Sequence, residues 1–401
     1  MRIFCGKLIT PFETLEDMVV SLEGGKVSSI EHVSERLNCP CGYPHLANVP
    51  EGVFDAGEST ITPGFIDVHI HGGAGFDVMD ATYESLDGIS RHLAAAGVTS
   101  FLPTTVTASW EDTIAVVSAT AEAMEIGTSG AQILGVHLEG PYLNPDKKGA
   151  QYPDFLREPS VQEFREKLGT LSSIVRIVTV APELPGATDL IRYLAVRNIN
   201  VSMGHSEATF EQASDAIDAG ACHATHLFNA MRPLQHRDPG IAGAVLADNR
   251  VRAELVWDNL HVHPGTARIV VNAKGPENVM LVSDAMPAAG LQDGDYHLGA
   301  HKVFVRNGEA RLADGTIASS IITLDAAVRN AAGFFPLNEA VMMATYVPAY
   351  GVGAEREKGS IAVGKDADLA ILSSELEVKQ VILRGRCAEQ GVSADGSFDC
   401  C

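Results

Sequence analysis

The segment Ile61-Thr-Pro-Gly-Phe-Ile-Asp-Val-His69-Ile-His71-Gly72 combines an apolar run with two histidines at its end. Side chains two residues apart on a strand point to the same face, so His69 and His71 can both reach one ion at the mouth of the strand. A His-X-His pair alone is a weak signal, because a solvated turn can carry the same residues. The segment therefore predicts a buried strand with a candidate metal-binding end.

Four later segments repeat this pattern of an apolar run that ends in a metal-binding or acid-base side chain. These side chains are Glu139, His205, His226 and Asp284. Polar groups at the carboxyl ends of strands are typical of the catalytic face of a parallel barrel. Each residue has a structural alternative, such as a surface carboxylate for Glu139 or a helix N-cap for Asp284. Their agreement favours a hydrolytic metal centre over these alternatives.

From residue 61 onward, apolar strands alternate with helix-length amphipathic stretches, which is the pattern of parallel β/α units. Helices are expected at 83–96, 110–125, 161–168, 188–198, 208–219 and 264–272. The strands number eight, which closes a TIM-like (β/α)8 barrel: 65–70, 100–104, 132–138, 176–180, 199–203, 221–225, 252–257 and 279–283. The fold class is therefore predicted as α/β.

The two ends of the chain have a different pattern, with short runs punctuated by turns. Strands are expected at 2–8, 18–22 and 26–30 near the start, and at 302–305, 310–312 and 378–383 near the end, with a turn that leads into a further strand over 359–372. Helices are expected at 322–332 and 337–345. We expect residues 1–60 and 346–401 to pair into one small β-sandwich domain beside a barrel of residues 61–345.

The composition limits the possible partners. Lys and Arg number 29 against 51 Asp and Glu, a formal net charge of -22, which repels nucleic acid and anionic membranes. An anionic substrate then needs a local cationic clamp. No apolar run approaches the roughly 18 residues of a membrane span, and the start of the chain does not resemble a signal peptide, so we expect a soluble, cytoplasmic protein. The seven cysteines are an odd number and argue against a disulfide framework.

The donor types indicate the metal and its chemistry. Imidazole and carboxylate ligands together suit zinc or ferrous iron better than magnesium, with one or two ions per subunit left open. A bound metal lowers the pKa of water to about 7. A carboxylate such as Asp284 beside that water can take its proton and pass it to a leaving amine.

Several motifs together resemble the N-acetylglucosamine-6-phosphate deacetylases of the amidohydrolase superfamily. They are Pro63-Gly-Phe-Ile-Asp-Val-His-Ile-His-Gly72, His137-Leu-Glu-Gly-Pro141, Gly204-His-Ser-Glu-Ala-Thr209, His226-Leu-Phe-Asn-Ala-Met231, Pro239-Gly-Ile-Ala-Gly-Ala244 and Leu281-Val-Ser-Asp-Ala285. The resemblance implies a barrel with a β-sandwich-like satellite. It also implies that Glu139, His205 and His226 bind the primary metal and that Asp284 is the catalytic acid and base. A second ion at His69 and His71, bridged by Glu139, is our hypothesis.

The resemblance further implies the substrate and the residues that contact it. The expected reaction removes the N-acetyl group from N-acetylglucosamine 6-phosphate and releases acetate and glucosamine 6-phosphate. Some contacts can come from a partner subunit, so a homodimer is expected. The implied substrate-binding residues are Ala150, Gln151, Asn229, Ala230, Arg237, His261, Ile317, Ala318 and Ser319.

The chain departs from the family pattern at the expected substrate rim. Gln151 stands where histidine is usual, and Asn259 and Ser319 stand where glycine is common. These departures leave two alternatives open. One is an amidohydrolase acting on N-acetylgalactosamine 6-phosphate or another N-acyl substrate, and the other is a non-catalytic homologue.

Overall fold

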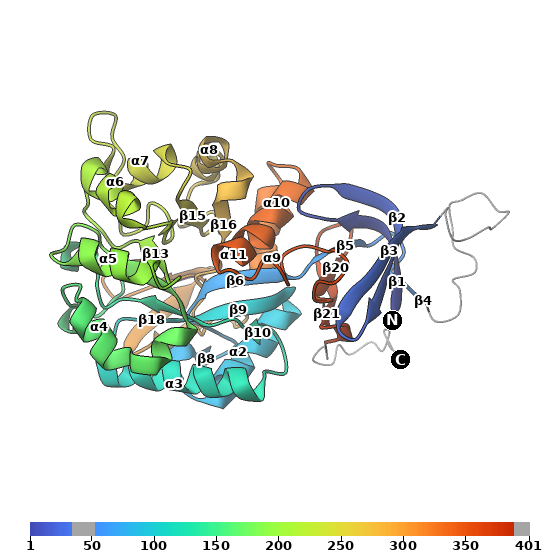
Figure 1. Ribbon diagram of the computed structural model, residues 1–401, viewed down its shortest axis with the longest axis horizontal. Helices are drawn as coiled ribbons and strands as arrows, with labels where there is room; N and C mark the ends of the chain where they lie inside the picture. Colours follow the sequence, from blue (N-terminus) through green and yellow to red (C-terminus); the bar gives the residue numbers. More distant parts are fainter. Residues whose placement is uncertain (34–52, 389–401) are drawn as a thin grey trace.

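The computed structural model describes residues 1–33 and 53–388, and within them the predicted barrel is confirmed. Hydrogen bonds close it between its first and last strands: the Asp284 N–H donates to the His69 carbonyl at 2.9 Å, and the His71 N–H donates to Ala285 at 2.8 Å. Figure 1 shows these strands surrounded by helices. In spatial order the eight parallel strands are β6 (Phe65–Ile70), β9 (Val98–Thr105), β11 (Val136–Glu139), β12 (Val175–Val180), β13 (Asn200–Met203), β14 (His223–Ala224), β15 (Arg252–Leu255) and β16 (Val279–Leu281).

Helices with well-defined ends cover the barrel. Ser109 caps the start of α3 by accepting from the Asp112 N–H, and Gly220, with φ of 119°, ends α6. The predicted helices correspond to α2 (Tyr83–Ala95), α3 (Trp110–Ile126), α4 (Val161–Leu168), α5 (Ala187–Ala195), α6 (Phe210–Ala219), α8 (Pro264–Lys274), α9 (Leu324–Ala332) and α10 (Leu337–Ala344). No helix in the described part of the chain is both long and apolar enough to cross a membrane.

Both ends of the chain contribute to a separate sheet beside the barrel (Figure 1). Its order is β22 (Arg386–Cys387), β21 (Val378–Leu383), β20 (Leu369–Leu372), β5 (Thr60–Pro63), β1 (Arg2–Ile9), β2 (Thr14–Glu23) and β3 (Lys26–His32), with β4 (Val53–Asp55) also paired to β1. A hydrophobic cluster of its own stabilises this sheet, with Ile3, Val20, Ile61 and Leu369 among its members. The predicted association of the two ends is confirmed.

Two elements lie across the predicted division of the chain. β5 pairs with β1 and β20 in the small sheet, although residues from 61 onward were expected in the barrel. α11 (Tyr346–Gly351) packs on the barrel through Val347 and Ala349, although residues from 346 onward were expected in the small domain. Both segments are short and mostly buried, so periodicity alone could not assign them to one core or the other.

A three-stranded antiparallel sheet follows the last barrel strand. It consists of β17 (Gly294–Leu298), β18 (His301–Arg306) and β19 (Glu309–Arg311). The short pairs β7 (Gly72–Gly73) with β8 (Phe76–Asp77), and β10 (Gln132–Ile133) with β9, complete the strands of residues 53–388. Cys39, Cys41, Cys400 and Cys401 lie outside the described residues.

Candidate metal-dependent active site

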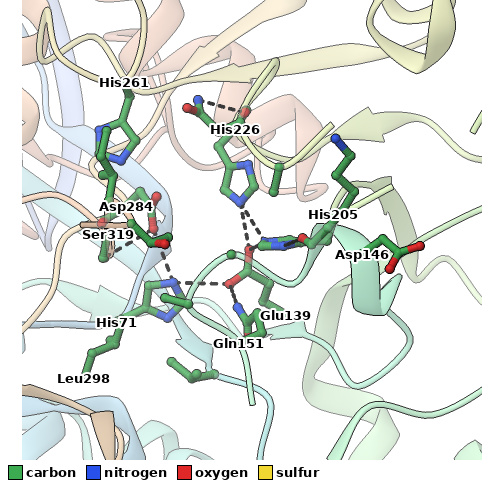
Figure 2. Close-up of a pocket in the computed structure, with 18 residues that line it drawn as sticks. His71, Glu139, Asp146, Gln151, His205, His226, His261, Asp284, Leu298 and Ser319 are labelled. Atoms are coloured by element: carbon green, nitrogen blue, oxygen red, sulfur yellow. Dashed lines mark hydrogen bonds and ion pairs between the residues drawn. The ribbon is translucent and has the colours of Figure 1, made fainter. Parts of the chain in front are cut away.

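The predicted ligands lie together at the carboxyl ends of the barrel strands. His69 is the penultimate residue of β6 and His71 follows that strand, Glu139 is the last residue of β11, and His205, His226 and Asp284 follow β13, β14 and β16 within three residues. All of them except the fully buried His69 line a pocket of about 370 Å³ (Figure 2). The structure therefore brings these six residues to one face of the barrel, where the catalytic groups of barrel enzymes lie.

A first group of donors surrounds one oxygen of Glu139. The His205 Nε2 lies 3.2 Å from Glu139 Oε1, and the His226 Nε2 lies 3.1 Å from the same oxygen. The two imidazole nitrogens are themselves 3.1 Å apart. All three side chains are at least 94 % buried. Three potential metal-ligand atoms this close together, with little access to water, form a group able to hold one cation.

A second group lies on the other side of the same carboxylate. The His71 Nε2 is 3.4 Å from Glu139 Oε2 and 3.3 Å from Asp284 Oδ1. The His69 Nε2 is 3.3 Å from the His71 Nε2 and 3.5 Å from Asp284 Oδ1. Figure 2 shows His71 between Asp284 and Glu139, with His205 and His226 beyond Glu139. Glu139 therefore lies between the two groups: its Oε2 faces His71, and its Oε1 faces His205 and His226 and also lies 3.6 Å from the His69 Nε2.

The outer nitrogens of three of these histidines indicate which nitrogen carries the proton. The Nδ1 of His69 contacts Glu254 Oε2 at 2.8 Å, the Nδ1 of His71 contacts the Thr104 carbonyl at 3.1 Å, and the Nδ1 of His205 contacts the Lys147 carbonyl at 2.8 Å. Because a carbonyl or carboxylate oxygen only accepts, each Nδ1 donates and a neutral ring keeps a lone pair on Nε2. These lone pairs converge on the centre, which is the tautomer that metal ligation requires.

The electrostatics of the metal-free site also favour a cation. Burial alone would lower the pKa of His71, but its contacts with Asp284 and Glu139 outweigh burial and raise the pKa to about 9. Burial alone would raise the pKa of Glu139, but the neighbouring imidazoles, His69 foremost, hold it well below its usual range. The Glu139 and Asp284 carboxylates thus stay ionised and favour protons on His69 and His71. Metal binding displaces such protons, so the residues fit a divalent ion.

Gln151 connects the pocket wall to the bridging carboxylate. Its Oε1 accepts from the Thr107 N–H at 2.7 Å, and its Nε2 donates to Glu139 Oε2 at 2.6 Å. Because a backbone N–H requires an acceptor, the bond to Thr107 determines which way the amide faces. Gln151, which stands where the family usually has histidine, therefore donates a hydrogen bond to Glu139 in this chain.

Asn259 and Ser319, the other two departures, share an unusual backbone conformation. Their φ values are 66° and 65°, in the left-handed region where glycine is least strained. The Ser319 hydroxyl also donates to the Asp284 carbonyl at 2.5 Å. Asparagine tolerates this conformation better than most residues, and the serine gains a hydrogen bond there. Both residues therefore stand where the backbone takes a conformation that glycine adopts most easily.

Most of the expected substrate-binding residues line the pocket, but two do not. Ala318 is buried in the hydrophobic cluster beneath β17–β19, and Arg237 is exposed on the loop between β14 and α7 (Gly240–Ala247). Those in the lining are Ala150, Gln151, Asn229, Ala230, His261, Ile317 and Ser319.

The pocket also contains residues that we did not predict, namely Val106, Asp146, Lys147, Gly149, Leu298 and Thr316. Lys147 forms an ion pair with Glu207 at 2.6 Å. The Lys147-Lys148 pair was the sequence signal for a cation near this pocket. Val106, Leu298 and Thr316 carry no comparable signal, because their types occur throughout the chain.

Known proteins resemble this chain in sequence and architecture over most of its length. The model of the amidohydrolase family matches residues 60–388. An N-acetylglucosamine-6-phosphate deacetylase of Bacillus subtilis is 39% identical, over 97% of each chain, and an N-acetylgalactosamine-6-phosphate deacetylase of Escherichia coli O157:H7 is 38% identical, over 95% of this chain and 97% of its own. A solved N-acetyl-D-glucosamine-6-phosphate deacetylase variant from Mycobacterium smegmatis, in complex with N-acetyl-D-glucosamine-6-phosphate, superposes with a TM-score of 0.89 at 34% identity, covering 97% of this chain and 99% of its own. The chain belongs to the amidohydrolase family.

Proposed function

We propose that this protein is a metal-dependent hydrolase that removes the N-acetyl group from N-acetylglucosamine 6-phosphate, giving glucosamine 6-phosphate and acetate. The observation that carries the proposal is the convergence of imidazole nitrogens and carboxylate oxygens around Glu139 at the floor of an open pocket. The relatives named above supply the substrate class. Their identities of 39% and 38% are too close to separate a gluco from a galacto sugar.

The donor set supports two metal positions. Glu139, His205 and His226 would hold the primary ion, and His69 and His71 would hold a second ion that shares Glu139. Imidazole and carboxylate donors favour zinc or ferrous iron. When bound, such an ion polarises an acyl carbonyl and lowers the pKa of a water molecule.

Asp284 is the residue that would move the proton. Burial alone would raise its pKa, but His69 and His71 outweigh burial and keep the pKa below its usual value, so the carboxylate is ionised and able to accept. Its backbone is held on both sides, because its N–H donates to the His69 carbonyl and its carbonyl accepts from Ser319. The Asp284 carboxylate would take a proton from the attacking water and deliver it to the nitrogen of the leaving amine.

Other pocket residues would orient the sugar. The His261 ring lines the pocket and its Nδ1 lies 2.6 Å from Asp258 Oδ2. Burial alone would lower the pKa of His261, but Asp258 outweighs burial and raises it. The ring can therefore donate through Nε2 to a sugar hydroxyl or carbonyl. Ala150, Asn229, Ala230, Ile317 and Ser319 would provide the remaining contacts.

We propose that the phosphate is bound across a homodimer. Among the described pocket-lining residues, the one lysine or arginine is Lys147, and Glu207 already neutralises it. Arg237 is exposed and outside the pocket of its own subunit, on a loop that a partner subunit could receive. A guanidinium suits bidentate phosphate binding. Arg237 would thus act in the pocket of the other subunit.

Acetate release tests the proposed activity. Purified protein should release acetate from phosphorylated N-acetyl hexosamines, gluco and galacto compared side by side, and much more slowly from the unphosphorylated sugars. Equal rates with phosphorylated and unphosphorylated sugars would contradict the proposed binding of the phosphate by Arg237. No release from any N-acyl substrate would favour a non-catalytic homologue instead.

Asp284→Asn tests the acid-base role. The amide keeps the volume of the side chain but cannot accept the proton, so we expect turnover to fall about 10²- to 10⁴-fold. Metal content and thermal stability should stay close to those of the unmodified protein. Near-normal turnover in the Asn variant would exclude Asp284 as the base.

A further inference from the structure

Glu254 is a buried carboxylate that the proposed reaction does not use. It lies in the middle of β15, between Ala253 and Leu255, and its side chain is 0% exposed. An ionised carboxylate in such a position is costly unless polar partners surround it. Within residues 1–33 and 53–388, no lysine or arginine forms an ion pair with Glu254, so a structural salt bridge does not explain it.

The partners of Glu254 belong to both donor groups of the active site. Its Oε2 lies 2.8 Å from the His69 Nδ1 and accepts from the backbone N–H of His226 at 3.2 Å. The backbone carbonyl of Glu254 also accepts from the Leu227 N–H at 2.9 Å. One residue of β15 therefore touches the histidine of β6 and the loop that carries the histidine after β14.

These contacts restrict how both histidines can face the centre. With Oε2 as acceptor, the His69 proton must lie on Nδ1, which leaves the Nε2 lone pair directed toward His71 and Asp284. The same oxygen holds the peptide of His226, whose φ is 29° and thus lies in a strained region. Carboxylates that orient metal-binding histidines in this way typically contribute 10- to 100-fold to metal affinity.

We propose that Glu254 is a positioning residue that holds His69 and the His226 peptide in the geometry required for binding two ions. The inference rests on the metal centre of the proposed function. Since the shorter contact of the Glu254 carboxylate, at 2.8 Å, is with the His69 ring, whereas at His226 it contacts only the backbone N–H, its loss should affect the ion at His69 and His71 most. The ion at Glu139, His205 and His226 should stay bound.

Glu254→Gln is the direct test, because glutamine keeps the shape but can place an NH₂ group against the His69 Nδ1 and shift the ring proton to Nε2. Protein purified with zinc would be dialysed against graded chelator buffers, and the ions retained per subunit would be measured by elemental analysis. We expect one ion to be lost at a free zinc concentration 10- to 100-fold higher than in the unmodified protein, with the other ion unchanged.

Two further variants separate positioning from general damage. Glu254→Asp keeps the charge but shortens the side chain by one methylene group. Its affinity for the same ion should therefore fall by a smaller factor than in Glu254→Gln. His223→Leu alters a buried histidine of the neighbouring strand β14 that has no hydrogen-bond partner within the described residues, and it should retain both ions. If Glu254→Gln does not fold, the Asp variant decides the question.

The outcomes distinguish this inference from the proposed function. Unmodified affinity for both ions in the folded Glu254 variants would overturn the positioning role and leave the deacetylase proposal standing. A loss of zinc in His223→Leu equal to that in Glu254→Gln would also overturn it, because the effect would not be specific. Unmodified protein that binds no zinc at all would overturn both proposals.

Discussion

The candidate ligands combine buried side chains with an uncommon backbone conformation. His205, His226 and Asp284 have φ values of 47°, 29° and 49°, all in the left-handed region. Non-glycine residues there are strained and persist where the surrounding structure holds them. Hydrogen bonds to Lys147, Glu254 and Ser319 do so here. With this backbone conformation, each of the three side chains lines the pocket beyond the end of its strand.

His223 permits a test of burial through the pH dependence of stability. Burial, with a smaller effect of Arg252, lowers the pKa of His223 from 6.5 to about 3. Between these values the unfolded chain binds the proton more tightly, so this histidine destabilises the fold as the pH falls below about 6.5. His223→Leu should reduce the slope of unfolding free energy against pH by up to about 1.4 kcal/mol per pH unit. Urea denaturation from pH 7 to pH 4.5 measures this slope, and equal slopes in both proteins would exclude the effect.

Single residues could be predicted where a simple signal marked them. His69, His71 and Glu139 end apolar runs, and a polar residue at the end of a buried strand is the expected pattern of a barrel site. Glu254 was missed because it lies inside a strand rather than at its end. A charge within a predicted buried strand was nevertheless the available signal. The position of Arg237 outside the pocket could not be predicted, because the sequence does not show where the loop between β14 and α7 lies relative to the pocket.

Helices and strands were predicted correctly from the sequence where their hydrophobic periodicity was clear. The barrel strands and the helices α2, α3 and α4 lie within a few residues of their predicted positions. α7 was not predicted, because Gly240-Ile-Ala-Gly-Ala-Val-Leu-Ala247 contains two glycines and no polar face. β17 was not predicted either, because Gly294-Asp-Tyr-His-Leu298 is mostly polar and only its last residue is buried. Both contradict simple periodicity, and tertiary packing stabilises them.

The end of β6 provides a test of the two-ion hypothesis. A His69→Ala and His71→Ala double variant removes two of the donors around the second position but leaves Glu139, His205 and His226 in place. We expect metal content to fall from two ions to one per subunit, with turnover reduced and the fold retained. One ion per subunit in both the unmodified and the double-variant protein would contradict the two-ion hypothesis.

For the whole molecule, the location of Arg237 predicts that the pockets depend on dimerisation. Arg237→Ala and Asp284→Asn should each be nearly inactive alone. In a mixed dimer, the pocket with an intact Asp284 would receive Arg237 from the Asp284→Asn subunit. Mixing the two variants under exchange conditions should therefore restore activity, measured as acetate release. No recovery, although exchange is demonstrated by differently tagged subunits, would place Arg237 in its own subunit's pocket or outside the reaction.

The barrel and the small sheet were both predictable at this scale, because β/α alternation and terminal β segments are long-range patterns. The exact boundaries between the barrel and the small sheet were not predictable. β5 and α11 are short segments whose apolar residues, such as Ile61 and Val347, could pack into either core, and only the completed fold determines which one they join.

The central claim is that a metal ion held by Glu139, His205 and His226 makes this site hydrolytic. The most direct test is to remove metal with a chelator, return zinc in measured steps, and determine bound zinc and acetate release from N-acetylglucosamine 6-phosphate on the same samples. The account predicts negligible activity without metal and recovery that follows the bound ion. Full acetate release from protein shown to contain no metal would contradict it.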